Sequence, residues 1–165
     1  MAAASPTKDH SSSLFFEKAK RFCVYKERST YAMHAKLKAW GAADDTAHKV
    51  VNRLVEEKFI DNSRYLNAYI RGKFGIKKWG KRKISFMLKS EGFSYEEFAP
   101  FLSAIDDEYE SVLIKLIQNK MNQNKSAGNS TKLKQKVIRY CMQKGYDYQI
   151  IDKVLNQNSF FNDTE

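Results

Sequence analysis

Three short segments of this chain end in the same helix-stop signal, and this repetition limits the fold more than any other feature. A run of helix-forming residues reaches a glycine in KLKAWGAAD (36–44), MLKSEGFS (87–94) and CMQKGYD (141–147). The three glycines are separated by about 50 residues each, and a residue able to cap a helix follows each of them. The sequence therefore predicts three copies of one unit, in which a helix, a second helix, a glycine turn and a third helix follow in order.

Apolar residues recur at helical spacing throughout these units, and no stretch alternates between apolar and polar residues as a strand would. We expect the first four helices to begin at or after Ser13, Ser29, Asp44 and Asp61, because short polar side chains cap helix N-termini. Pro100 should kink or shorten the sixth helix. Residues 122–130 are expected to form a flexible turn.

The predicted fold is all-α: three tandem three-helix repeats, stacked into an elongated, curved rod. Three helices of this length bury little surface alone, so neighbouring units should pack on each other. The predicted divisions are a disordered tail over 1–12, repeats over 13–60, 61–105 and 106–158, and a frayed tail over 159–165.

Charge predicts an anionic partner. The 165 residues carry a formal net charge of +10. An excess of this size favours nucleic acid first, an anionic membrane surface second and an acidic protein third. No apolar run reaches the ~18 residues of a membrane span, and the N-terminus lacks the apolar core of a secretory signal. Cys23 and Cys141 lie inside apolar helical patterns, which is typical of reduced core thiols in a cytoplasmic protein.

The positive charge is concentrated in two blocks. Eight bases and no acid lie between Arg71 and Lys89, and eight bases and no acid lie between Ser111 and Tyr146. In the stretch from Ser90 to Ile114, every charged residue is an acid. Basic side chains of this kind neutralise phosphates. The predicted binding face for DNA or a filament consists of Arg71, Lys73, Lys77, Lys78, Lys81, Arg82, Lys83, Lys89, Lys132, Lys134, Lys136 and Arg139.

Aromatic residues are interleaved with the first basic block. Trp79 stands between Lys78 and Gly80, and Phe74 stands five residues before it. We consider two interpretations of Trp79: it stacks on an exposed base or anchors a partner protein, or it fills a corner between helices. Phe74 is the second candidate for a stacking or anchoring role.

Signals for catalysis are weak. Of the three histidines, only His48 has a candidate partner, Asp44, four residues earlier. A helix-start carboxylate near an exposed imidazole explains this pair better than a catalytic dyad. No His/Cys cluster has zinc-ligand spacing, and Asp106 to Glu108 are explained as helix N-terminal charges rather than a magnesium site. We therefore expect no enzyme activity, no metal and no cofactor; a nuclease is the least favoured alternative.

Three passages resemble the RecX family, the bacterial regulators of the RecA recombinase. They are KERSTYAMHAKL (26–37), the specific middle passage from Val50 to Ser94, and RYCMQKGYDYQIIDKVL (139–155). The middle passage carries FID at 59–61, then Tyr65, Arg71 and Gly80 before a basic helix. The resemblance covers roughly residues 14–157.

The resemblance implies three tandem three-helix units and no cofactor. It also implies binding to RecA filaments on DNA, which dampens their ATPase, coprotease and strand-exchange activities. The expected partners are the RecA filament and non-sequence-specific DNA, single-stranded or duplex, with no membrane. We expect a cytoplasmic monomer. The alternative is a stand-alone helical DNA-binding protein that competes for single-stranded or duplex DNA. In that case residues 29–41 and 44–57 would form a helix-turn-helix pair.

Overall fold

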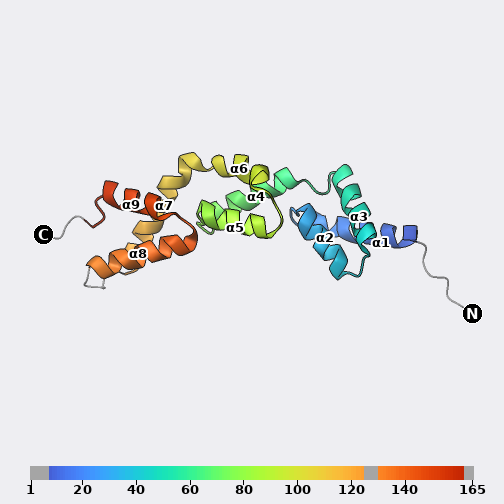
Figure 1. Cartoon of the computed structure of the whole chain (residues 1–165), viewed down its shortest axis with the longest axis horizontal. Helices are drawn as coiled ribbons and strands as arrows, with labels where there is room; N and C mark the ends of the chain where they lie inside the picture. Colours follow the sequence, from blue (N-terminus) through green and yellow to red (C-terminus); the bar gives the residue numbers. More distant parts are fainter. Residues whose placement is uncertain (1–7, 125–129, 162–165) are drawn as a thin grey trace, which may run out of the picture. The chain divides into compact units, whose positions relative to one another are not determined.

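A computed structural model describes residues 8–124 and 130–161, and the regular structure within these ranges is entirely helical (Figure 1). The helices are α1 (Lys8–Val24), α2 (Thr30–Ala39), α3 (Asp44–Glu56), α4 (Asn62–Gly75), α5 (Lys81–Ser90), α6 (Tyr95–Ser103), α7 (Asp106–Asn122), α8 (Ser130–Lys144) and α9 (Tyr148–Gln157). They form two compact units, 1–68 and 69–165, with the boundary inside α4. The prediction of an all-α fold is confirmed.

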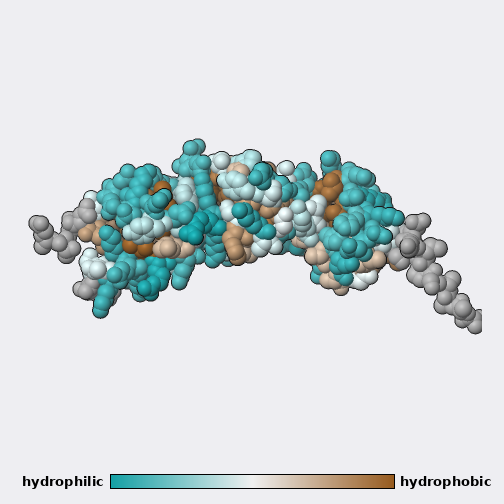
Figure 2. All heavy atoms as spheres, viewed as in Figure 1, coloured by the Kyte–Doolittle hydropathy of each residue, from teal (hydrophilic) through white to brown (hydrophobic). Residues whose placement is uncertain are grey.

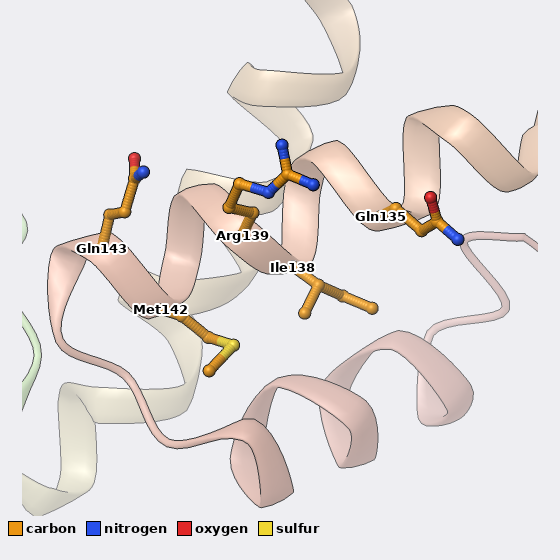
Figure 3. Close-up of a pocket in the computed structure, with 5 residues that line it drawn as sticks. All are labelled: Gln135, Ile138, Arg139, Met142 and Gln143. Carbon is orange, nitrogen blue, oxygen red and sulfur yellow. The ribbon is translucent and has the colours of Figure 1, made fainter.

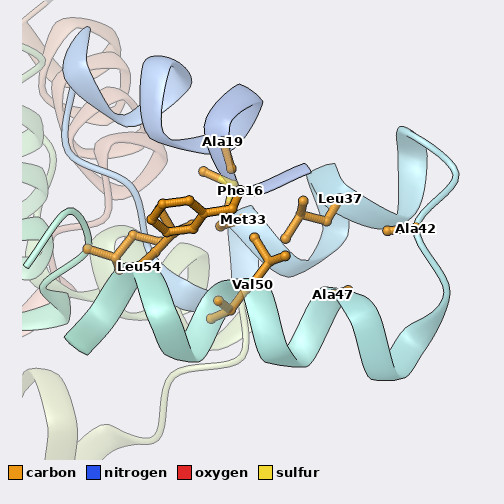
Figure 4. Packing of buried hydrophobic residues seen from close by; sticks show 10 residues of the cluster. Phe16, Ala19, Met33, Leu37, Ala42, Ala47, Val50 and Leu54 are labelled. Carbon is orange, nitrogen blue, oxygen red and sulfur yellow. The ribbon is translucent and has the colours of Figure 1, made fainter. Parts of the chain in front are cut away.

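The first unit is built on the apolar stripes of α1, α2 and α3, which pack pairwise on each other. Figure 4 shows the resulting core, in which Phe16 from α1 lies among Met33 and Leu37 from α2 and Val50 and Leu54 from α3. Each of these five side chains is at most 1% exposed. Side chains of this size stabilise a fold chiefly by removing apolar surface from water.

The start of α4 is tied to the same unit by polar contacts. The Asn62 amide oxygen accepts a hydrogen bond from the Thr30 backbone N–H at 3.0 Å. The Arg64 guanidinium pairs with Glu27 at 2.9 Å. Asp61 caps α4, as predicted, because its Oδ1 accepts from the N–H groups of Ser63 and Arg64.

Buried side chains of α5 and α6, and of α7, α8 and α9, contribute to the interior of the second unit. Ile84 and Leu88 of α5 and Phe98 of α6 are fully buried, and α5 packs on α6. The helices α7, α8 and α9 pack pairwise on one another. Their shared core consists of Leu113, Leu116, Ile117, Val137, Cys141, Tyr146, Ile151, Val154 and Leu155.

The three predicted helix stops have one geometry. Gly41, Gly92 and Gly145 have φ of 91°, 106° and 96°, which is the left-handed region that favours glycine. In each turn the glycine N–H donates to the carbonyl three residues earlier, and the next N–H donates to the carbonyl five residues earlier. This pair of bonds defines the Schellman motif. The residue after each glycine, Ala42, Phe93 or Tyr146, is buried. The repeat predicted from the sequence is therefore also present in the backbone.

The beginning of α5 lies against the turn between α8 and α9. The Gly80 N–H donates to the Lys144 carbonyl at 2.8 Å, and the Arg82 N–H donates to the Gly145 carbonyl at 3.2 Å. From α7, the Tyr109 hydroxyl accepts from the Lys81 N–H at 3.0 Å. Burial raises the pKa of Tyr109 to about 12, so this phenol stays protonated. These contacts fix the position of α5 within its unit.

Several local predictions are wrong. Helix α1 begins at Lys8 rather than Ser13, so residues 8–12 are not a disordered tail. The N-cap of α3 is Ala43 rather than Asp44. Phe160 and Phe161 pack against the α7–α9 core instead of belonging to a frayed tail.

Other predictions stay untested. The predicted tails over 1–7 and 162–165 and the centre of the predicted turn, 125–129, lie outside the described residues. The prediction that Pro100 kinks or shortens α6 stays untested, because the proline lies inside this helix, which continues to Ser103. The repeat boundaries and the elongated, curved shape stay predictions.

Candidate nucleic-acid and partner interface

Helix α5 separates its apolar stripe from an exposed face. Ile84 and Leu88 point into the core, whereas Arg82, Phe86 and Lys89 are exposed. Residues three and four apart lie on the same side of a helix, so these three exposed side chains share one face. Two of them belong to the predicted binding face, and Phe86 adds an apolar ring that is 71% exposed.

The first turn of α5 concentrates charge in an unfavourable place. Lys81, Arg82 and Lys83 occupy it, with no acid among them. Cations at a helix N-terminus are repelled by the positive end of the helix dipole. Anions that approach this end from outside α5 would offset the repulsion among these three bases and the helix dipole.

Grooves join α5 to its neighbours on α6 and α8. A groove of about 460 Å³ is lined by Arg82, Phe86 and Lys89 together with Tyr95. A second, of about 360 Å³, is lined by Arg82 and Phe86 together with Met142. Phe86 and Arg82 line both grooves, so the two are adjacent.

A third groove, of about 520 Å³, follows α8. Figure 3 shows Ile138 and Met142 projecting from one side of this helix and Arg139 and Gln143 from the other. Met142 is 45% exposed, and it also lines the groove beside Phe86. We call the resulting region the α5–α8 surface and define it as Arg82, Phe86, Lys89, Ile138, Arg139 and Met142. It combines arginine and lysine with apolar side chains. The face of the molecule that is seen in Figure 2 is largely hydrophilic.

Some predicted basic residues already have acidic or carbonyl partners. The Lys81 ammonium pairs with Asp106. Arg82 Nε lies 3.4 Å from Asp147 Oδ1, and both side chains are more than half exposed. Lys83 Nζ donates to the Gln143 carbonyl at 3.4 Å. A phosphate would have to compete with these partners, although exposed pairs such as Arg82–Asp147 contribute little stability.

The remaining predicted bases are placed less uniformly. Arg71, Lys77, Lys89, Lys132, Lys136 and Arg139 are exposed, and Lys73, Lys78 and Lys134 are half-buried. Lys136 Nζ donates to Asn124 Oδ1 at 2.5 Å. The structure thus places all twelve predicted bases in one unit. Five of them line the three grooves: Lys81, Arg82, Lys83, Lys89 and Arg139. The α5–α8 surface contains the three of these that are exposed, Arg82, Lys89 and Arg139.

The two aromatic candidates have different outcomes. Trp79 is half-buried, and the ammonium groups of Lys73 and Lys83 lie 4.7 and 4.6 Å from its ring centroid. Its stacking or anchoring role stays a prediction. Phe74 is 3% exposed and stacks on Tyr109, with ring centroids 5.9 Å apart. The prediction is wrong for Phe74, because a buried ring presents no face to a base or partner.

The apolar part of the surface was not predicted from the sequence. Neither Phe86 nor Met142 belongs to the predicted site residues. A usable signal existed for Phe86: it lies two residues from both Ile84 and Leu88, so it faces away from the stripe that they define.

The structure also brings histidines together in the first unit. His34 from α2 joins the sequence neighbours Asp44 and His48 from α3, with ligand atoms within 4.8 Å of one another. The sequence pattern pointed to His48 and Asp44 alone. The other acidic candidate, Asp106 to Glu108, occupies the first turn of α7, as expected for helix N-terminal charges.

Three-helix units with matched glycine turns define a helical repeat protein, and its second unit carries a basic and partly apolar exposed surface. No helix within the described residues is long and apolar enough to cross a membrane. Two family models match this chain: "RecX, third three-helix domain" over residues 106–155 and "RecX, first three-helix domain" over residues 16–54. The chain belongs to the RecX family.

Similar proteins carry the same family name. A regulatory protein RecX of Clostridium botulinum strain Eklund 17B is 34% identical over 125 residues, covering 74% of this chain and 58% of the relative. One from Clostridium perfringens strain 13 is 28% identical over 148 residues, covering 86% and 69%. The chain thus spans under two thirds of the first of these relatives.

Solved structures show the same fold. The crystal structure of RecX from Lactobacillus salivarius matches with a TM-score of 0.79 at 19% identity, covering 90% of this chain and 97% of that one. Another crystal structure of a regulatory protein RecX matches with the same TM-score at 16% identity. Likeness at this level of identity supports the fold alone.

Proposed function

We propose that this protein binds RecA filaments on DNA and lowers their recombinase, ATPase and coprotease activities, and thereby acts in DNA repair and SOS regulation. Membership of a family of regulatory proteins named RecX carries the proposal. The formal net charge of +10 supports it, because a RecA–DNA filament presents phosphate. We expect the protein to act in the cytoplasm as a monomer, without catalysis or a cofactor.

The α5–α8 surface is the proposed contact. Arg82, Lys89 and Arg139 would neutralise backbone phosphates, which positions a protein on nucleic acid without reading its sequence. Phe86 and Met142 would supply the apolar anchors that dominate binding energy at protein–protein contacts. A surface with both kinds of side chain suits a target in which protein and DNA lie side by side.

The first experiment measures the single-strand-dependent ATPase of the cognate RecA while this protein is titrated in. Inhibition well below one molecule per RecA supports the proposal, because one bound molecule must then affect many subunits. Inhibition only when DNA is limiting would indicate competition for the strand, the alternative function. DNA binding without any effect on RecA would contradict the proposal.

A charge-matched pair of variants tests the surface. Arg82→Gln with Arg139→Gln removes two charges from the α5–α8 surface. Lys26→Gln with Lys49→Gln removes two exposed charges from the first unit and serves as the control. We expect the first variant to weaken filament binding substantially more than the second. Equal weakening would mean that net charge, and not this surface, is responsible.

A salt titration of binding to a single strand measures how many phosphates the protein neutralises. If about five phosphates are contacted, the slope of log affinity against log salt should be about −3.5. The Arg82→Gln, Arg139→Gln variant should reduce the steepness by about 0.7 for each phosphate that it no longer neutralises. A sequence-specific duplex-binding protein would instead bind one DNA site much more tightly than other sequences.

A further inference from the structure

Two pairs of side chains face each other in the first repeat. His34 and Lys38 are four residues apart on α2, and Asp44 and His48 are four residues apart on α3. Residues at this spacing lie on one side of a helix. The turn at Gly41 returns the chain so that α3 packs on α2. The two polar pairs therefore meet at the surface near this turn.

The facing groups are close. His34 Nε2 lies 3.8 Å from Asp44 Oδ1, which is longer than a hydrogen bond. The imidazole rings of His34 and His48 have centroids 4.3 Å apart, with planes tilted by 42°. One ligand atom from each of His34, Asp44 and His48 lies within 4.8 Å of the other two.

The Nε2 atom of His34 is buried and has no hydrogen-bond partner among the described residues. A buried imidazole nitrogen without a partner is costly unless something else binds it. The side chain as a whole is 28% exposed and Asp44 is 65% exposed, so an ion from solvent can reach the cluster.

We propose that His34, Asp44 and His48 form a binding site for a divalent transition-metal ion, with Zn²⁺ the best match. Two imidazoles and one carboxylate are a donor set that zinc commonly uses. Calcium and magnesium require oxygen ligands, which this cluster does not supply in sufficient number. Three protein ligands leave a fourth position for water, since zinc is usually four-coordinate.

The required movement is small. Zinc bonds of about 2.0–2.2 Å place tetrahedral ligands about 3.3 Å apart. The most distant pair of ligand atoms therefore has to close by at most about 1.5 Å, which rotation of exposed side chains supplies. Bound metal would link α2 to α3 and so stabilise the first repeat.

Lys38 opposes the ion. Its Nζ lies 2.9 Å from Asp44 Oδ1, and this ammonium is the main reason why the pKa of Asp44 lies below its usual range. A metal ion must displace the ammonium from the carboxylate. Lys38 is 45% exposed, so its side chain can turn into solvent when that happens.

If zinc binds at this site, its affinity should depend on His34 and His48. Non-specific binding to other surface side chains would not depend on them. The whole 165-residue chain, stripped of metal with a chelator, is titrated with Zn²⁺ by calorimetry. A second titration uses Co²⁺ and follows its visible absorption. We expect one Zn²⁺ ion to bind per chain. We expect the absorption of bound Co²⁺ to indicate coordination by imidazole. His48→Gln and His34→Gln should each weaken affinity by at least about 10-fold, because even residues behind the ligands change affinity that much.

Two further variants give opposite expected results. Lys38→Gln should strengthen zinc binding, since it removes the competing ammonium. His10→Gln removes the remaining histidine and should leave affinity unchanged. His48 is exposed, so its variant should fold even if His34→Gln does not, and circular dichroism checks both.

Three results with the variants would overturn the site. They are loss of binding in His10→Gln equal to that in His48→Gln, unchanged binding in His48→Gln, and weaker binding in Lys38→Gln. Absence of zinc binding by the stripped wild-type protein would also overturn it. This test does not use the RecA ATPase, so its result does not depend on the proposed function.

Discussion

Gly80 and Gly145 meet backbone to backbone: a Cβ added at Gly80 would lie 2.3 Å from the Gly145 carbonyl oxygen. The same contact is tight from the other side, where a Cβ at Gly145 would lie 2.4 Å from Cβ of Lys83. Real Cβ atoms do not approach so closely, so neither position tolerates a side chain without movement of α5 away from the α8–α9 turn.

Gly80→Ala should therefore destabilise the second unit by about 1–3 kcal/mol, the usual cost of forcing atoms into a packed site. Gly72→Ala is the matched control. It lies in α4 with nothing within 4 Å of the added Cβ, and alanine is favoured over glycine in a helix by about 1 kcal/mol. Urea unfolding should shift in opposite directions for the two variants; a loss of stability in both would contradict the close approach.

Ser29 should contribute to stability as the N-cap of α2. It is fully buried, and its Oγ accepts from the Ala32 N–H at 3.0 Å. Ser29→Ala should cost about 1 kcal/mol, as cap removal commonly does. Ala43, the N-cap of α3, lacks a capping side chain, so Ala43→Ser should raise stability. Thermal unfolding measures both, and the prediction fails if the two variants change the melting temperature in the same direction.

The capping carboxylate of Asp61 should make stability depend on pH. Its pKa lies below the usual range, chiefly because the Arg64 backbone N–H donates to it, and the Ser63 N–H adds a second bond. A lowered pKa in the folded state means that the charged form stabilises folding. This contribution is complete above the unfolded pKa of about 3.9 and is lost as pH falls through the lower folded value.

Asp61→Asn keeps an acceptor oxygen and removes the charge. The stability difference between wild type and this variant should be largest near pH 6 and should shrink as pH falls towards 3. Denaturant midpoints at several pH values supply the comparison. A difference that stays constant with pH would show that the charge of Asp61 does not contribute.

The two thiols should differ in reactivity. Cys141 is fully buried in the α7–α9 core, and burial raises its pKa to about 12. Cys23 is half-buried, and burial raises its pKa as well. Because the thiolate is the reactive form, a disulfide reagent at pH 8 should modify Cys23 first. Cys141 should react only at the rate at which its unit unfolds, and rapid labelling of both would contradict the buried position.

Lys81 and Arg139 should contribute unequally to DNA binding although each carries one charge. The Lys81 ammonium pairs with Asp106 and lies 5.0 Å from the Tyr109 ring centroid. Arg139 is exposed and projects from α8 (Figure 3). Fluorescence anisotropy with a labelled single strand should show weaker binding for Arg139→Ala than for Lys81→Ala. The reverse order would place the phosphate-binding side chains on the α7 side of α5.

The local structure was largely predictable from the sequence. Helix stops at Gly41, Gly92 and Gly145 and the caps at Ser29 and Asp61 depend on residues within one turn of the chain. Such signals do not need the rest of the fold to be present. The predicted caps at Ser29 and Asp61 are confirmed, whereas α1 begins before Ser13 and Ala43 rather than Asp44 caps α3. The concentration of bases between Arg71 and Lys89 also identified the segment that contains the basic first turn of α5.

Which of these residues lie in contact could not be predicted from local signals. Lys81 is paired with Asp106, Phe74 is buried against Tyr109, and His34 lies beside Asp44, across sequence separations that no local rule spans. Those contacts depend on how the helices pack, which is set by the summed burial of many apolar side chains. Local sequence signals were enough to predict the helical class, the glycine stops and the charge of each segment. The packing decided which charges are compensated, which rings are exposed and which histidines share a site.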